Sequence, residues 1–90
     1  MKPVEILETA AALVGGDRAE QHGDFRILHE RAANLWSAYL RTEVRADEVA
    51  FCMVLLKLAR AETGRHNPDD GVDAAAYAAL WAALSEDRNA

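Results

Sequence analysis

The sequence predicts an all-α fold, a compact bundle of about four helices, and three observations lead to this prediction. About half of the 90 residues are apolar, with many Ala and Leu but only two Pro and five Gly, a composition that favours packed helices. Apolar residues recur at spacings of three and four in four separate stretches. Polar residues, with Gly, Asn, Asp or Pro among them, separate these stretches. We therefore expect one domain over residues 1–90, small enough that forming a homodimer would bury more apolar surface.

The first helix is predicted over residues 3–14. Gly15 and Gly16 are suited to ending it. Glu5 and Glu8 form an E-x-x-E pair, which can bind a cation, although a solvated helix face is the preferred interpretation. The apolar face comprises Val4, Leu7, Ala11 and Val14. A polar, Gly-containing loop follows and ends near Asp24.

The second helix is predicted over residues 25–40, with Asp24 as its N-cap. His29 lies on the apolar side and should point inward or into a cleft, either as a hydrogen-bonded core or interface residue or as a ligand-binding group. Trp36 and Tyr39 are either core residues or platforms that stack on a base. The apolar face comprises Phe25, Leu28, Ala32, Leu35, Trp36 and Tyr39.

The third helix, over residues 46–62, is apolar around much of its circumference, so we expect it to be the central, most buried helix, with Cys52 inside. Lys57 and Arg60 interrupt the apolar run. Their charged heads either reach solvent or face an anion, for which a phosphate group or a carboxylate of the next helix would serve. Glu48, in the first turn, is a capping residue or a metal ligand.

The fourth helix, over residues 68–85, carries the clearest start signal of the chain. Asn67 is suited to the N-cap and Pro68 to the first helical position. Asp70 lies where the positive end of the helix dipole favours a carboxylate. Asp73 lies at the border of the apolar stripe. The two carboxylates either hold a divalent cation between them, or Asp70 complements the dipole while Asp73 binds a Lys or Arg of a neighbouring helix.

Charge and motifs exclude several classes of function. A net charge of −5 disfavours generic nucleic-acid binding. Neither a membrane-spanning run nor a signal peptide is recognisable, so we expect a soluble, cytoplasmic protein without membrane contact. There is no C-x-x-C, no glycine-rich phosphate loop and no G-x-S-x-G.

Four segments, GDRAEQHGD, HERAANLWSAYL, DEVAFCMVLLKLAR and NPDDGVDAAAYAAL, together resemble a family of small phage and prophage proteins. The resemblance covers roughly residues 5–81. Two positions depart from the family pattern, because His22 stands where Tyr is usual and Leu28 where Asn is usual. The matching positions are Asp17, Arg18, Gly23, Asp24, His29, Glu30, Arg31, Trp36, Lys57, Arg60, Asp73 and Tyr77.

More distantly, the helices are similar to the all-α nucleoside triphosphate pyrophosphohydrolases of the MazG type. That resemblance implies dimers or tetramers in which an E-x-x-E helix faces an E-x-x-D helix across Mg²⁺, with Asp70 to Asp73 standing for E-x-x-D. The hypothesis of a Mg²⁺-dependent nucleotide hydrolase assigns roles to residues of this chain. Catalysis would involve Asp73, Lys57, Arg60 and His29; substrate binding Arg18, Asp24, Trp36 and Tyr77; and Mg²⁺ binding Asp70, Asp73, Glu48 and Glu30.

Two further interpretations stand beside a Mg²⁺-dependent nucleotide hydrolase, which we place slightly ahead. The first is a non-catalytic phage inhibitor of a host defence complex, of the anti-CRISPR type, whose acidic surface covers a basic groove. The second is that His29, Lys57, Arg60 and Asp73 form a buried polar network that fixes helix register or the oligomer interface. The inward position of these ionisable groups favours a site, whereas the acidic excess favours an inhibitor.

Overall fold

A computed structural model describes residues 1–16 and 23–89, which form four α-helices. These are α1 (Pro3–Gly15), α3 (Phe25–Leu40), α4 (Ala46–Ala61) and α5 (Pro68–Arg88). The predicted all-α fold of four helices is therefore confirmed. Both predicted N-caps are present, since the side chains of Asp24 and Asn67 accept the backbone N–H of Arg26 and Asp69 at 2.8 and 3.0 Å. None of the described helices is both long and apolar enough to cross a membrane.

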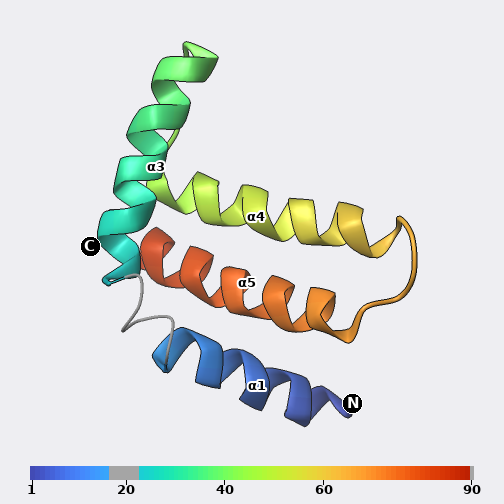
Figure 1. Ribbon diagram of the computed structural model, residues 1–90. Coiled ribbons are helices and arrows are strands. Elements are labelled where there is room, and N and C mark those ends of the chain that lie inside the picture. The colour runs from blue at the N-terminus through green and yellow to red at the C-terminus, as the bar shows by residue number, and fades with distance from the viewer. Residues whose placement is uncertain (17–22, 90) are drawn as a thin grey trace.

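The helices α1, α5 and α4 lie side by side as a layer, and α3 runs across one end of it (Figure 1). The central helix is α5, which packs against α4 on one side and α1 on the other. The prediction that the third helix is the central, most buried one was therefore wrong. The C-terminal half of α3 projects beyond the layer like an arm, as Figure 1 shows.

The small side chains of α5 explain its central place. Val72 and Ala76 of α5 pack with Ala10 of α1 as a buried cluster, against which Leu13 and Val14 also pack. Alanines let two helices approach closely, but each buries little apolar area. Val72 is the largest side chain that is fully buried. The core inside one chain is therefore thin.

Large apolar side chains remain exposed on α3 and α4. On α3, Leu28, Leu35 and Tyr39 are 51%, 71% and 86% exposed, although their spacing predicted a buried face. On α4, the exposed large side chains are Phe51, Leu55, Leu56 and Leu58, and Cys52, which we expected inside, is exposed as well. These two faces were predicted to lie in the core because amphipathic spacing identifies a face that needs covering, without showing what covers it.

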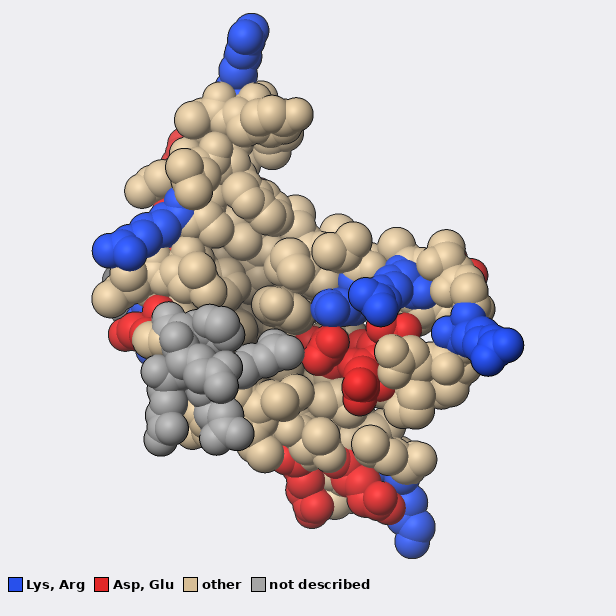
Figure 2. Space-filling view, in the orientation of Figure 1, with Lys and Arg blue, Asp and Glu red and all other residues tan. Residues whose placement is uncertain are grey.

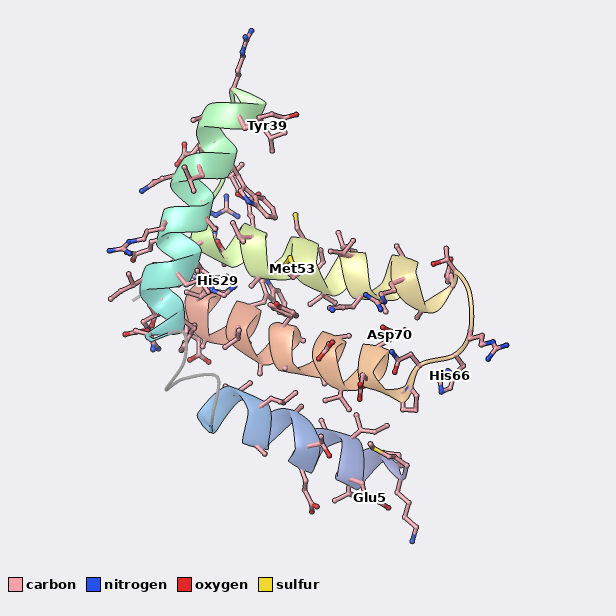
Figure 3. All side chains as sticks on the ribbon, viewed as in Figure 1. Glu5, His29, Tyr39, Met53, His66 and Asp70 are labelled. Atoms are coloured by element: carbon pink, nitrogen blue, oxygen red, sulfur yellow. The ribbon has the colours of Figure 1, made fainter. Side chains whose placement is uncertain are left out.

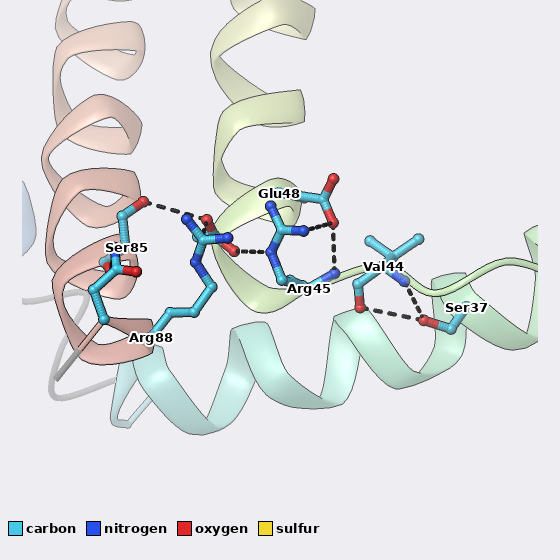
Figure 4. A network of polar contacts seen from close by, with 8 residues as sticks. Ser37, Val44, Arg45, Glu48, Ser85 and Arg88 are labelled. Atoms are coloured by element: carbon cyan, nitrogen blue, oxygen red, sulfur yellow. Dashed lines mark hydrogen bonds and ion pairs between the residues drawn. The ribbon is translucent and has the colours of Figure 1, made fainter.

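Polar contacts fix the turn before α4 and the start of α4 (Figure 4). The hydroxyl of Ser37 accepts the backbone N–H of Val44 at 2.8 Å and donates to the carbonyl of Ala33 at 2.7 Å, which holds the turn between α3 and α4. Arg41, in the left-handed region with φ 57°, ends α3 within that turn. At the start of α4, the buried carboxylate of Asp47 accepts from Arg45 Nε at 3.2 Å and from the Ser85 hydroxyl of α5 at 3.3 Å.

Candidate functional site

A pocket of about 430 Å³ lies where α1, α3 and α5 meet. Ligand pockets in proteins typically enclose about 300 to 1,000 Å³, so this one is large enough for a nucleoside-sized molecule. Its wall is mostly apolar, with a few polar groups. It is lined by Leu13 and Val14 of α1, by Gly23, Asp24, Phe25, Leu28 and His29 at the start of α3, and by Ala76, Tyr77 and Leu80 of α5.

His29 is the most enclosed polar group of this pocket, with 4% of its surface exposed (Figure 3). Its Nδ1 lies 2.7 Å from the carbonyl oxygen of Phe25, one turn earlier on α3. A carbonyl only accepts, so Nδ1 carries the proton of this bond, and Nε2 of the neutral ring is then an acceptor. His29 is thus held in one orientation by its own helix. The two predicted roles of His29, a core residue and a ligand-binding residue, are both compatible with this position, because the buried ring also lines the pocket.

Two aromatic rings and one carboxylate accompany His29. The ring of Phe25 meets the imidazole edge to face, at 6.4 Å between centroids and 76° between planes. Arg26 lies over the ring of Phe25 at 4.5 Å and donates from Nε to Asp87 of α5 at 2.6 Å, a bond that raises the pKa of the guanidinium. Tyr77 contributes the second ring from α5, and Asp24 contributes the carboxylate.

A row of ion pairs continues along α5 from this pocket. Lys57 Nζ of α4 lies 3.1 Å from Asp73 Oδ2, and both side chains are about four-fifths buried. Asp73 precedes Tyr77 by four residues, so the two lie one turn apart on the same side of α5. Arg60 Nε lies 3.6 Å from Asp70 Oδ1, one further turn away. Figure 2 shows basic and acidic side chains directly beside one another on this face.

The four predicted Mg²⁺ ligands do not meet. Asp70 and Asp73 are each paired with a cation of α4. Glu48 accepts the backbone N–H of Arg45 at the other end of α4, about 18 Å along the helix from Arg60 at 1.5 Å per residue. Glu30 is exposed on α3. Within residues 1–16 and 23–89, no group of three His, Cys, Asp or Glu residues could hold a metal ion. This arrangement does not fit a carboxylate metal centre.

The E-x-x-E pair of the first helix, Glu5 and Glu8, does not face Asp70 and Asp73 as a second pair of Mg²⁺ ligands would. Glu5 lies on α1, beyond α5, whereas Asp70 lies on the α4 side of α5 (Figure 3). Glu48 instead caps the start of α4, which is one of the two roles predicted for it.

The structure places the other predicted site residues differently. Asp24, His29 and Tyr77 line the pocket, and Lys57, Arg60 and Asp73 form the adjoining ion pairs. Trp36 lies about two turns beyond His29 on α3 and is not part of the pocket wall. Arg18 lies outside the described residues. The network predicted for His29, Lys57, Arg60 and Asp73 is therefore only partly present, since His29 bonds to its own helix.

Two features were missed by sequence reasoning. Leu13 and Val14 form the pocket wall on α1, and their helical spacing gave no sign of what they would face. Asp47 is 6% exposed at its side chain and joins α4 to α5. Its only signal in the sequence was its place in the first turn of a helix beside Glu48, where an acidic residue is ordinarily a solvated partner of the dipole.

The fold and the pocket define an all-α domain with a ligand-sized pocket between α1, α3 and α5, close to interhelical ion pairs. Residues 5–85 match the family described as "Domain of unknown function (DUF6378)", and the chain belongs to this family. It is 42% identical over 78 residues to "Gene 55 protein" of Mycobacterium phage L5, which covers 86% of this chain and 50% of the relative. It is 37% identical over 73 residues to "Gene 55 protein" of Mycobacterium phage D29, covering 81% and 48%.

These relatives confirm the predicted resemblance to a family of phage proteins. The chain spans about half the length of the curated relatives it matches. No solved structure matches the chain significantly.

Proposed function

We propose that this protein binds a nucleoside phosphate, with the base in the pocket between α1, α3 and α5 and the phosphates along the neighbouring ion pairs. One observation carries the proposal: a pocket of about 430 Å³ lined by Phe25, His29 and Tyr77 lies one helical turn from the pair of Lys57 and Asp73. An aromatic, mostly apolar cavity next to paired charges suits a ligand that is planar at one end and anionic at the other.

The base would be held by surfaces and by a few directional bonds. The rings of Phe25 and Tyr77 offer flat apolar area, on which any base can stack. His29 Nε2 offers an acceptor and Asp24 a carboxylate, both of which suit the exocyclic N–H groups of a base.

The phosphates would bind by exchanging partners with the ion pairs. Lys57 and Arg60 are held by single carboxylates at 3.1 and 3.6 Å. A phosphate carries more charge and more acceptor oxygens than a carboxylate, so it competes effectively for the same ammonium and guanidinium groups. Arg60 is the easier of the two to recruit, because its side chain is 64% exposed.

We extend this proposal in two ways: the bound nucleotide is cut by pyrophosphohydrolysis of the MazG type, and the protein is a dimer. The hydrolase prediction is supported by the convergence of Asp24, His29 and Tyr77 on the pocket wall, but no step is derived through Mg²⁺, because its predicted ligands are separated or paired with cations. The dimer is supported by the exposed apolar faces of α3 and α4.

The test is equilibrium binding of nucleosides and of ribo- and deoxynucleoside mono-, di- and triphosphates, with and without Mg²⁺. We expect Tyr77→Leu, which keeps apolar bulk but removes the ring, to weaken nucleosides and nucleotides alike. The double variant Lys57→Gln, Asp73→Asn replaces a charged pair by a neutral one of similar shape. It should weaken nucleotides by at least about tenfold while leaving nucleosides unchanged, because one phosphate contact to a cation contributes about 1.5 kcal/mol or more.

Arg31→Gln is the matched control, since it removes an exposed cation of α3 that is not part of the pocket wall. Pyrophosphate release, measured in the same samples, decides whether the bound nucleotide is also cut. If the wild-type chain binds no nucleoside phosphate at millimolar concentration, the proposal fails, and the inhibitor of a host complex becomes the leading hypothesis.

A further inference from the structure

One chain exposes more surface than a compact protein of its mass. Its accessible surface is 6583 Å², whereas a folded monomer of 9.9 kDa is expected to expose about 5,200 Å². The radius of gyration is 13.8 Å, against about 12 Å for a compact domain of this length. The excess of roughly 1,400 Å² is comparable to the area that each partner buries in a large, permanent interface, in which about 2,000 Å² or more is buried in total.

The excess surface includes two apolar faces that meet at an angle. The first is the arm face, the side of α3 that carries Leu28 near the start of the helix and Leu35 and Tyr39 on its projecting half. The second is the outer face of α4, with Phe51 and Leu55 one turn apart and Leu56 and Leu58 on either flank. The ring of Phe51 also packs against Trp81 of α5, at 5.5 Å between centroids. All seven side chains are more than two-fifths exposed. In Figure 3 the side chain of Tyr39 points into the angle between the two helices, and the inner side of this angle is free of charged colour in Figure 2.

The chain cannot close this angle onto itself without breaking its own turn. Residues 41–45 connect α3 to α4, Arg41 is in the left-handed region, and Ser37 holds Val44 through its hydroxyl. Each chain therefore exposes two apolar faces, the arm face of α3 and the outer face of α4. A two-fold axis would satisfy both, because each arm then lies on the α4 of the other copy.

We infer that a second copy of this chain covers these faces, with the arm face of each copy packed on the outer face of α4 of the other, so that two α3 and two α4 helices form a shared four-helix core. The seven residues that a single chain leaves in water then become core residues, which supplies the apolar burial that the small side chains of α5 do not. This specifies the partner and the surface of the proposed dimer, and it does not depend on nucleotide binding.

The test is the mass of the full chain in solution without nucleotide, by light scattering and sedimentation equilibrium. We expect the wild type at twice the 9.9 kDa of the chain. Leu35→Glu, on the arm, and Leu55→Lys, on α4, each place a charge in the shared core and should weaken association by at least about 100-fold. Leu7→Glu is the matched control, since Leu7 is 62% exposed on α1, outside both faces.

Mixing the two variants tests the arrangement itself. In a mixed dimer with this packing, one arm face carries Glu where the facing α4 carries Lys, so opposite charges share that contact, while the second pair of faces stays apolar. We expect the mixture to recover the dimer mass and the helical circular dichroism even where each variant alone is unfolded. A folded wild-type monomer would overturn the inference and leave both faces to another partner. A mixture that fails to associate would overturn the packing of α3 on α4.

Discussion

Asp47 should contribute more to stability than its place in the sequence suggests, and Asp47→Ala measures this contribution. The carboxylate is almost fully buried and accepts hydrogen bonds from Arg45 at 3.2 Å and from Ser85 at 3.3 Å. Arg88 Nε lies 3.6 Å away, beyond hydrogen-bonding distance. The contacts join the start of α4 to the end of α5, so their loss should loosen the main helix pair of the layer.

The expected loss of stability follows from the groups that Asp47 contacts. A hydrogen bond between charged groups contributes about 1.5 to 3 kcal/mol and a neutral donor about 0.5 to 1.5 kcal/mol. The side chains of Arg45 and Arg88 are 44% and 45% exposed, so water compensates them after the substitution, and the low end applies. We expect the free energy of unfolding to fall by about 2 kcal/mol, which lowers Tm by about 8 to 16 °C in a domain of this size.

Thermal and urea unfolding followed by circular dichroism measure this change, with all variants at one protein concentration because an associating chain has a concentration-dependent Tm. Asp69→Ala is the matched control, since Asp69 occupies the second helical position of α5 as Asp47 does in α4, but is exposed. The control should lose only the dipole contribution, about 0.3 to 1 kcal/mol. Equal losses in the two variants would refute the claim that the contacts of Asp47 stabilise the α4 and α5 pair.

Three further expectations follow from the packing and the junctions. Val72→Ala removes two methyl groups from the largest fully buried side chain and should lower the free energy of unfolding by about 1.5 to 2.5 kcal/mol in urea titrations; a change below 0.5 kcal/mol would show that the α1 and α5 contact is loose. Ser37→Ala leaves the Val44 N–H without its acceptor and should cost about 1 kcal/mol, whereas Ser37→Thr retains the hydroxyl and should cost less; the reverse order by thermal unfolding would contradict the role of the turn. Arg26→Gln breaks an ion pair with Asp87 that is about half exposed on both sides, and Tm should stay unchanged at moderate salt; a large drop would show that the pair is shielded from solvent.

Local signals in the sequence were sufficient for the helices. Asp24 and Asn67 were predicted as N-caps and both accept the expected backbone N–H, because capping depends only on residues within one turn. The pairing of Lys57 with Asp73 was one of the alternatives left open, and it is present at 3.1 Å. Its geometry required the relative position of α4 and α5, which no local pattern provides.

The burial of the third helix was predicted incorrectly for a physical reason. Residues 51–58 are apolar around much of the helix, and this indicates a need for cover from several directions. Within one chain α4 receives cover from α5 and, at its start, from α3, so Cys52 and Leu55 remain exposed. The pattern thus identifies sides of the helix that need cover, and it does not show whether the other helices of the same chain supply that cover.

The same reasoning connects the thin core to the site. A layer whose central helix is built from alanines can hold α1 and α4 close to α5, but it leaves its two faces without a second layer. Helix α3 covers one end only, and the pocket forms where the N-terminal half of α3 meets α1 and α5. Leu28 belongs both to the pocket wall and to the arm face. A second copy on that face would therefore adjoin the pocket, so the affinity for a nucleoside should fall in Leu35→Glu, although Leu35 is not part of the pocket wall. Unchanged nucleoside affinity in a monomeric Leu35→Glu chain would show instead that each pocket is complete within one copy.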